Sequence, residues 1–555
     1  MPSLHSSRLL LPLLTLTSCV TGSSTPVDPS PTPRVELAAP TANLWYQHAV
    51  FYEVFVRSFQ DSNGDGKGDL AGLISRLDYL NDGDPNTTSD LGVDALWLMP
   101  VFDSPSYHGY DVTDYERIEP DYGTNADFER LCAEAHRRGM RVIVDLVINH
   151  TSSQHPWFQE SAASPDSPKR DWYMWSPVDP GWRQPWDLFS QGATWHPLNG
   201  AYYYGVFWGG MPDLNLRTPA VREEVKRLAS FWLDKGVDGF RLDAVRYLIE
   251  TGGGLTGQAD TPETHAFWKE FAAHVRSVKP DAALVGEAWT NTPLIAPYYG
   301  STAQVPQGDE LPLNFNFPLA EEIIKAARLG NGNGLALKLS EMRSRYPVGV
   351  ADAPFLTNHD HVRVATQLDG KPGALVTAAS LLLTLPGSPF LYYGEEVGLL
   401  NGTTQNDEAK RTPMPWDASK GGGFTSGTPW FAFAPGHEST HVAAQTTAPG
   451  SLLSRYRDLI RARHAAPALE RGGLTLLTST QNRTSTLAFS RTLEGERVLV
   501  VHNLGDSTEN AGPFELEGDI AEPLFMDPSV RAPERDGGTW RITLPARTTG
   551  IWRLR

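Results

Sequence analysis

Four apolar runs in this sequence end in side chains that can act as nucleophiles, acids or bases. They are DLVINH (145–150), GFRLDAV (239–245), LVGEAW (284–289) and FLTNHD (355–360). An unpaired buried carboxylate costs several kcal/mol, so such a residue is expected beside a charged partner or at an exposed strand end. A cap or an ion pair could explain any one of these endings. Four together indicate one shared reactive site.

The elements that carry these residues alternate between strand and helix. Strand-like apolar runs begin near residues 49, 94, 141, 239, 282, 313, 353 and 389, and helical patterns lie between them. Alternation of this kind predicts parallel strands with helical crossovers, and eight strands fit a closed (β/α)₈ barrel better than an open sheet. Side chains at the C-terminal ends of barrel strands converge on one cleft, which would bring Asp243, Glu287 and Asp360 together.

Two segments depart from the alternation. Residues 150–215 are rich in Trp and Pro and have little helical period, so we expect an inserted subdomain after the third strand. The barrel would then comprise residues 44–149 and 216–466. Short alternating runs after a helix near 451–464 predict a small antiparallel β domain over residues 467–555.

In this order and at these separations, the four runs resemble the four sequence regions of the α-amylase family of glycoside hydrolases. The resemblance extends to FYEVFVRSFQDSNGDGKGDL, SPSYHGYDVTDY, MPDLN and LPGSPFLYYGEE, and it covers roughly residues 45–463. It implies that Asp243 is the nucleophile, Glu287 the general acid/base and Asp360 the group that grips the sugar hydroxyls. The residues implied to line the subsite of the glucose being cleaved are Tyr110, Asp111, His150, Arg241 and His359.

The local chemistry agrees with these implied roles. Two nearby carboxyl groups can serve as nucleophile and acid if their environments separate their pKa values. Arg241 lies two residues before Asp243, on the same side of an extended chain, where it would keep that carboxylate ionised. Glu287 follows Gly286 and precedes an apolar pair, so it is better placed to hold its proton. The expected reaction is a retaining double displacement through a covalent glucosyl-enzyme.

The stretch DSNGDGKGD, residues 61–69, has the spacing of a calcium loop. Its candidate ligands are Asp61, Asn63, Asp65, the Lys67 carbonyl and Asp69. Hard oxygen ligands around a Gly turn suit Ca²⁺, and the family has a metal loop here, which favours a structural ion over a solvated acidic turn. The preceding run reads as a strand, which argues against an EF-hand. Asn149 resembles a second calcium position of many amylases, whose other ligands the sequence does not identify.

The N-terminus has the parts of an export signal. Arg8 precedes the apolar run LLLPLLTL, which is too short to span a bilayer, and we assign residues 1–18 to a signal peptide. Small residues before Cys19 resemble the lipobox of bacterial lipoproteins, so Cys19 would be lipidated and the exported protein tethered to a membrane. The alternative is an ordinary signal peptide of a secreted protein. Residues 19–43 are rich in Pro, Ser and Thr and are expected to form a disordered tether.

Composition restricts the partners. The net charge of −18 argues against nucleic acid and against anionic membrane surfaces. The 16 Trp, 18 Tyr and 22 Phe exceed what a core needs and suit a cleft that stacks on sugars. Cys132 shares a helical face with apolar neighbours, so we expect a core cysteine and no intrachain disulfide. We expect a monomer.

These observations favour an α-amylase that cuts internal α-1,4 bonds of starch and maltooligosaccharides. MPDLN, residues 211–215, resembles an intermediate group between the QPDLN of oligo-1,6-glucosidases and the MPKLN of neopullulanases. The nearest rivals are therefore an exo-acting α-glucosidase and a cyclomaltodextrinase. A glucan-binding surface protein without catalysis is the rival from another class.

Overall fold

The computed structural model describes residues 35–186, 191–477 and 484–555. The predicted signal peptide, Cys19 and most of the predicted tether lie outside these residues. In the parts of the chain that are described, no helix is both long enough and apolar enough for a membrane span.

A parallel sheet of seven strands forms the centre of the fold, in the order β12-β11-β10-β6-β3-β2-β13. The strands are β2 (Phe51–Val54), β3 (Ala95–Leu98), β6 (Arg141–Leu146), β10 (Gly239–Leu242), β11 (Ala283–Gly286), β12 (Leu313–Asn314) and β13 (Phe390–Tyr392). Ala353 bridges Phe315, which follows β12, and Phe355 bridges Phe390 of β13, both in parallel. Residues 353–355 therefore act as the missing strand, the seventh in chain order, and close the sheet, so the predicted (β/α)₈ barrel is confirmed.

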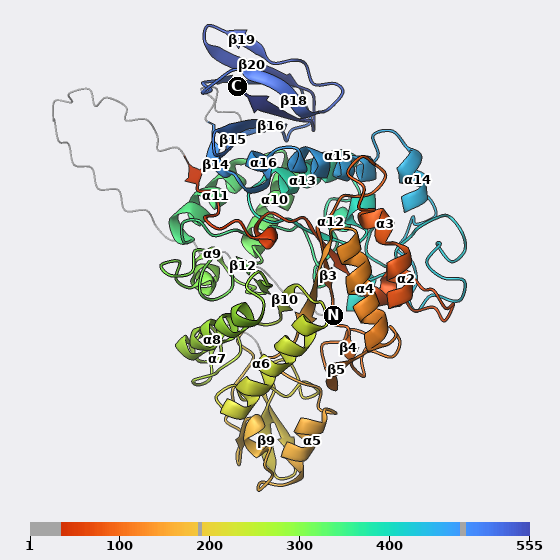
Figure 1. Cartoon of the computed structure of the whole chain (residues 1–555), viewed down its shortest axis with the longest axis vertical. Helices are drawn as coiled ribbons and strands as arrows, with labels where there is room; N and C mark the ends of the chain where they lie inside the picture. The colour runs from red at the N-terminus through yellow and green to blue at the C-terminus, as the bar shows by residue number, and fades with distance from the viewer. Residues whose placement is uncertain (1–34, 187–190, 478–483) are drawn as a thin grey trace, which may run out of the picture. The chain divides into compact units, whose positions relative to one another are not determined.

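Helices alternate with the strands along the chain, and Figure 1 labels them. They include α2 (Leu70–Ser75), α4 (Asn125–Arg137), α6 (Pro219–Asp234), α8 (Pro262–Val278), α10 (Phe317–Leu329), α13 (Pro372–Thr384) and α15 (Leu452–His464). Helix α4 is an example of a capped, amphipathic helix. The Thr124 side chain accepts the Asp127 backbone N–H at its N-terminus, and Phe128, Leu131, Cys132 and Ala135 are buried. The predicted core position of Cys132 is confirmed.

The barrel interior changes from apolar to polar along several strands. Phe51, Trp97 and Ile143 belong to one buried apolar cluster inside the barrel. Because side chains alternate along a strand, the inward position two residues after Phe51 is Glu53, and the one two after Ile143 is Asp145. This polarity places charged groups toward the C-terminal ends of the strands, where a cleft is expected.

The inserted subdomain lies between β6 and α6, as predicted. It contains α5 (Pro156–Ala163), the 3₁₀ turn η2 (Arg170–Trp172) and a small sheet in the order β7-β9-β8. The three strands are β7 (Trp175–Ser176), β8 (Trp195–Leu198) and β9 (Ala201–Tyr204). Figure 1 shows α5 and β9 together in this subdomain.

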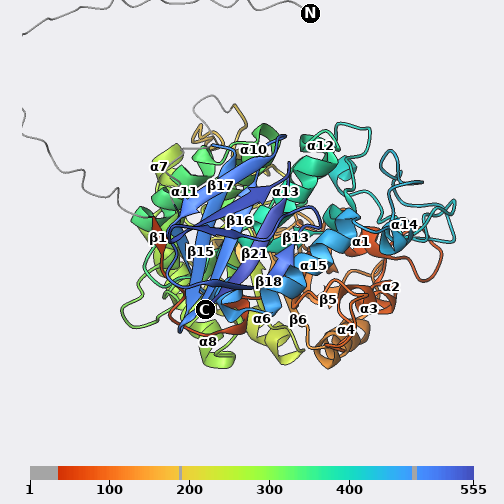
Figure 2. The same cartoon turned by 90° about the horizontal axis from the view of Figure 1, so that it is seen from above.

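Two antiparallel sheets make up the C-terminal part, which confirms the predicted β domain. One has the order β1-β14-β15-β16-β21-β18 and the other β17-β20-β19. The members of the first are β1 (Glu36–Leu37), β14 (Gly473–Leu476), β15 (Thr486–Leu493), β16 (Glu496–Asn503), β18 (Ile520–Met526) and β21 (Thr549–Leu554). Those of the second are β17 (Glu509–Phe514), β19 (Glu534–Asp536) and β20 (Thr539–Leu544). Figure 2 shows β15, β16, β21 and β18 side by side.

Two local predictions are wrong. Residues 35–43 were assigned to the tether, but β1 pairs antiparallel with β14, so a distant strand supplies the hydrogen bonds that order this segment. The run before the acidic loop is not strand throughout. It divides into β2 and the one-turn helix α1 (Val56–Phe59), because the chain must turn once it leaves the end of the barrel.

Candidate active site

Asp243 lies one residue beyond the end of β10. Arg241, two residues earlier, is fully buried, and its Nη1 lies 2.6 Å from Asp243 Oδ1 and 2.8 Å from Asp145 Oδ1. The parallel pairing of β10 with β6 puts Arg241 opposite Asp145, so the strand register itself creates this second contact. The buried guanidinium is thus compensated by two carboxylates, and one of them, Asp243, lines the cleft.

Glu287 follows β11 and faces the same guanidinium. Its Oε2 lies 3.0 Å from Arg241 Nη2 and accepts the backbone N–H of Ala244 at 3.0 Å. Ala244 has a φ of 50°, a left-handed conformation that is uncommon for a residue with a side chain and that aims this N–H at Glu287. Burial raises the pKa of Glu287 to about 7; Arg241 opposes this rise, and the carboxylates of Asp243 and Asp360 add to it. Glu287 can therefore carry a proton at neutral pH.

Asp360 follows the seventh barrel strand and lies beside His359 and Arg411. His359 Nε2 lies 3.0 Å from its Oδ2, and Arg411 Nη2 donates to its Oδ1 at 2.9 Å. Burial alone would raise the pKa of Asp360, but His359 and Arg411 outweigh it and hold that pKa well below its usual range. Arg411 was not found by sequence reasoning, because it follows no strand and lies 51 residues further along the chain.

Tyr110 and His150 join this network, but Asp111 stands apart. The Tyr110 hydroxyl lies 2.6 Å from His359 Nε2, and His150 Nε2 lies 3.1 Å from the Tyr110 carbonyl oxygen. Tyr110 and His150 line the cleft. The Asp111 carboxylate instead accepts hydrogen bonds from Ser104 and Ser106 and is not among the residues lining the cleft.

The cleft itself is a cavity of about 390 Å³ that contains all three predicted carboxylates. Its lining is His108, Tyr110, His150, Phe207, Trp208, Met211, Asp243, Glu287, Trp289, Asp360, Asp407 and Arg411. Trp208 is 56% exposed and Trp289 is 47% exposed, which is unusual for residues of this size. Exposed aromatic faces at a cleft can stack on sugar rings. The aromatic excess of the sequence hinted at such residues without identifying them.

A second cavity of about 510 Å³ adjoins the first at Glu287. The two share Phe207, Glu287 and Trp289, and the second adds Trp186, Ala244, Arg246 and Tyr247. The Trp186 ring packs edge-on against Tyr247 at 4.9 Å. The proton donor candidate therefore lies between two spaces, each with aromatic walls.

The acidic loop of residues 61–69 has an all-oxygen donor set, which is the chemistry that Ca²⁺ requires. Asn63 Oδ1 and Asp65 Oδ1 each accept a backbone N–H of the loop at 2.8 Å, and both side chains are exposed. Asp69 Oδ1, in contrast, accepts the Gly72 N–H of α2 at 2.7 Å. Among the described residues, no group of three or more His, Cys, Asp or Glu side chains could hold a metal ion. The calcium loop, with Asp61 and Lys67, stays a prediction.

Asn149 lies in a buried polar group beneath the inserted subdomain. Asn149 Oδ1, Asp213 Oδ2 and Glu250 Oε1 have no hydrogen-bond partner in the described part of the chain. Burial raises the pKa of Glu250 to about 8 and holds that of Asp213 well above its usual range. Such oxygens suit either a hard cation or a proton shared by two carboxyls, so the second calcium position also stays a prediction.

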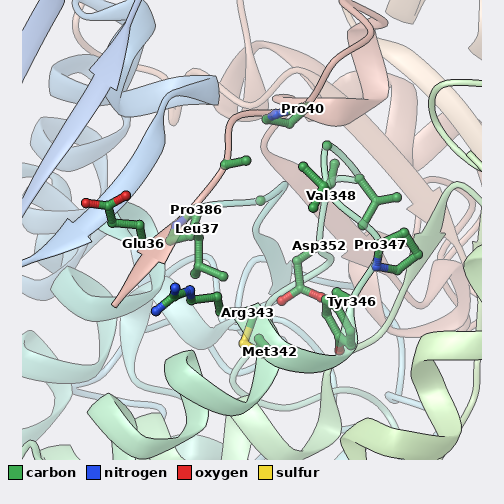
Figure 3. A pocket seen from close by; sticks show the side chains of 15 residues that line it. Glu36, Leu37, Pro40, Met342, Arg343, Tyr346, Pro347, Val348, Asp352 and Pro386 are labelled. Carbon is green, nitrogen blue, oxygen red and sulfur yellow. The ribbon is translucent and has the colours of Figure 1, made fainter. Parts of the chain in front are cut away.

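A third cavity, of about 220 Å³, contains none of the predicted site residues (Figure 3). It lies between residues 36–40 and the loop 346–352, and Figure 3 shows Leu37, Val348 and Asp352 around it. Burial raises the pKa of Asp352 to about 7. The reactive groups thus gather at the first two cavities.

Comparisons with known proteins identify relatives of this chain. The family described as "Alpha amylase, catalytic domain" matches residues 53–472. The chain is 43% identical to "Alpha-amylase 3" of Dictyoglomus thermophilum over 87% of this chain and 89% of that protein. It is 35% identical to a "Trehalose synthase/amylase" of Mycobacterium tuberculosis over 88% of each. A crystal structure of an α-amylase from H. orenii superposes with a TM-score of 0.80 at 39% identity, covering 92% of this chain and 100% of that one.

Proposed function

The chain belongs to the α-amylase family of glycoside hydrolases, and from that premise we propose that it cleaves internal α-1,4-glucosidic bonds of starch and maltooligosaccharides with retention of configuration. The observation that carries this proposal is the bridging of Asp243 and Glu287 by one guanidinium, at 2.6 and 3.0 Å. That arrangement places a carboxylate that can attack beside a carboxyl group that can carry a proton, on the same cleft.

In this mechanism Asp243 attacks the anomeric carbon while Glu287 gives its proton to the departing glycosidic oxygen. A glucosyl–Asp243 ester results. Glu287, now ionised, takes a proton from water, which attacks the same carbon from the opposite side to Asp243 and releases the sugar with its original configuration. Asp360, His359 and Arg411 hold the hydroxyls of the sugar being cleaved.

The second cavity supports action within a chain. The departing sugar must lie next to Glu287, which gives it a proton. The cavity of about 510 Å³ is lined by Glu287 and offers space for that sugar. Its Trp186 and Trp289 rings could stack on further glucose units of a bound chain. A polymer would use this space, whereas a disaccharide would fill little of it.

A second candidate is an exo-acting α-glucosidase of the same family. Asp407 and Arg411, from the loop after β13, line the cleft near Asp360. If this loop closes the donor end, only chain ends would enter. A binding protein without catalysis has the least support, because a binder needs no proton donor beside a nucleophile.

Products from soluble starch distinguish these activities. An α-amylase releases a mixture of maltooligosaccharides early in the reaction, and an exo-acting glucosidase releases glucose alone. A binding protein releases nothing. Asp243→Asn, purified in parallel, controls for a contaminating amylase, because any products it forms cannot come from this site.

Two accompanying proposals concern the ion and the anchor. The loop of residues 61–69 would hold a structural Ca²⁺ through Asp61, Asn63, Asp65, the Lys67 carbonyl and Asp69, which would add stability to the fold and take no part in the chemistry. Cys19 would carry the lipid of an exported, membrane-tethered protein. The subgroup suggested by MPDLN is part of the same proposal, because the subgroups differ in their substrates.

A further inference from the structure

We propose that Glu53 is a positioning residue that keeps His359 doubly protonated, so that its Nε2–H points at Asp360 and at the sugar bound there. Glu53 lies on β2 at an inward position and is buried. Its Oε1 lies 2.6 Å from Nδ1 of His359, a residue 306 positions away in the sequence. Glu53 is not among the residues lining the cleft, so it acts through His359.

The other ring nitrogen of His359 faces two oxygens. Nε2 lies 2.6 Å from the Tyr110 hydroxyl and 3.0 Å from Asp360 Oδ2. The Tyr110 hydroxyl can in turn donate to Asp145 Oδ2 at 3.1 Å. The imidazole therefore lies between a carboxylate on each side, with Tyr110 linking it to a third.

The other groups around His359 are either uncharged or already paired. The carboxylates therefore dominate the charge near its two ring nitrogens. The Trp97 ring packs edge-on against the imidazole at 5.8 Å and carries no charge. Arg241 is already shared among Asp145, Asp243 and Glu287. Arg411 Nε donates to the His359 carbonyl oxygen at 3.1 Å, and its Nη2 is paired with Asp360. His361, two residues on, has its pKa lowered to about 4 by burial and stays neutral.

Burial raises the pKa of Glu53, and the neighbouring His359 opposes that rise. With Glu53 ionised, the hydrogen-bond donors and acceptors around the ring require a proton on both nitrogens. A neutral imidazole that donated from Nδ1 to Glu53 would present a bare Nε2 to the Asp360 carboxylate, so that two acceptors would face each other at 3.0 Å. Protonating Nε2 turns that repulsion into a charge-assisted bond. It also frees the Tyr110 hydroxyl to donate to Asp145. Burial opposes a charged ring, but Asp360 and Glu53 outweigh it and raise the pKa of His359 to about 9.

Glu53→Gln tests this arrangement with little change of shape. The amide oxygen can still accept a hydrogen bond from Nδ1, but the negative charge is gone, so His359 should lose its second proton at lower pH. Glu53→Asp restores a carboxylate and should recover part of the effect. Glu395→Gln is the control for loss of a buried carboxyl group, because Glu395 is buried, accepts a hydrogen bond from the Tyr456 hydroxyl and does not line the cleft.

The activity assay uses α-glucosyl fluoride, whose departing fluoride needs no proton from Glu287. The alkaline limb of the pH profile measured with this substrate does not depend on the protonation of Glu287. It can therefore report the loss of a proton from His359. We expect Glu53→Gln to lower kcat/KM about ten- to a hundredfold, mostly through kcat, since hydroxyl contacts at the reacting sugar strengthen in the transition state. We also expect the alkaline limb to move down by about one pH unit or more. Glu395→Gln should match the wild type.

A direct measurement uses ¹⁵N-histidine-labelled protein and NMR, with the His359 signals identified by their loss in His359→Asn. Both ring nitrogens should be protonated at pH 7.5 in the wild type, and Glu53→Gln should lower the pH at which one proton leaves. A neutral His359 in the wild type at pH 7.5 overturns the proposal, even if Glu53→Gln fails to fold. So does a folded Glu53→Gln enzyme with an unchanged pH profile and kcat/KM. Only the activity assay rests on the proposed glucan cleavage. The NMR measurement needs no substrate, so it tests the protonation of His359 even if the proposed activity is wrong.

Discussion

Replacing Glu287 with glutamine should separate the two chemical steps of the reaction. Glutamine keeps the size of the side chain and can still accept the Ala244 N–H, but it cannot give up a proton. Burial raises the pKa of Glu287 to about 7, so about half of the molecules carry the proton at pH 7, against roughly 0.3% for an ordinary glutamic acid. Loss of a general acid slows a reaction about 10²- to 10⁴-fold, and we expect a loss in that range on starch.

The assay compares starch with α-glucosyl fluoride. Glu287→Gln should still form the glucosyl–Asp243 ester from the fluoride, because fluoride departs without a proton. Hydrolysis of the ester lacks its base, so the ester should accumulate and be visible as an added mass on the intact protein. Azide needs no base and should release it as α-glucosyl azide, since two inversions restore the starting configuration.

Wild-type pH dependence provides an independent check. Glu287 must be protonated to assist the departing sugar, so kcat/KM on starch should fall as the pH rises through about 7. The fluoride should not show this limb. The reasoning is refuted if Glu287→Gln loses activity on starch and on the fluoride equally and azide has no effect. Glu287 would then have a structural role, and another group would donate the proton.

The remaining predictions concern the nucleophile, the ion and the anchor. Asp243→Asn should lower the rate at least about 10⁴-fold with an unchanged melting curve, because the lost oxygen forms the covalent bond. Residual activity of a few per cent in folded protein would show that another residue is the nucleophile. Chelation should lower the melting temperature of the wild type but not of Asp65→Ala, since an ion bound only by the native state stabilises it by mass action. An unchanged wild-type curve contradicts the calcium loop. Cys19→Ser should release the exported protein from membranes, because each acyl CH₂ that the anchor buries is worth about 0.8 kcal/mol; a wild type that is wholly soluble after export would exclude the anchor.

Local pattern was sufficient for the framework of the fold. Strands leave short apolar runs and helices leave a 3.6-residue period, and both depend on neighbours in the sequence. Eight such runs predicted the barrel, and their polar endings identified Asp243, Glu287 and Asp360, which all line the cleft. The same reasoning failed at residues 35–43, because the hydrogen-bond partner of β1 is a strand more than 400 residues later.

By itself, the sequence determined which residues end the strands, because that depends on short-range periodicity. Only the tertiary structure decided which charges meet. Arg411 reaches Asp360 from a loop, Glu53 reaches His359 across the closed barrel, and Asp145 lies beside Arg241 through the register of two strands. The two members of each pair are far apart in the sequence, so no local pattern predicts the pair. They meet because the barrel closes. The protonation of Glu287 follows from burial in the same way, because burial is a property of the whole fold.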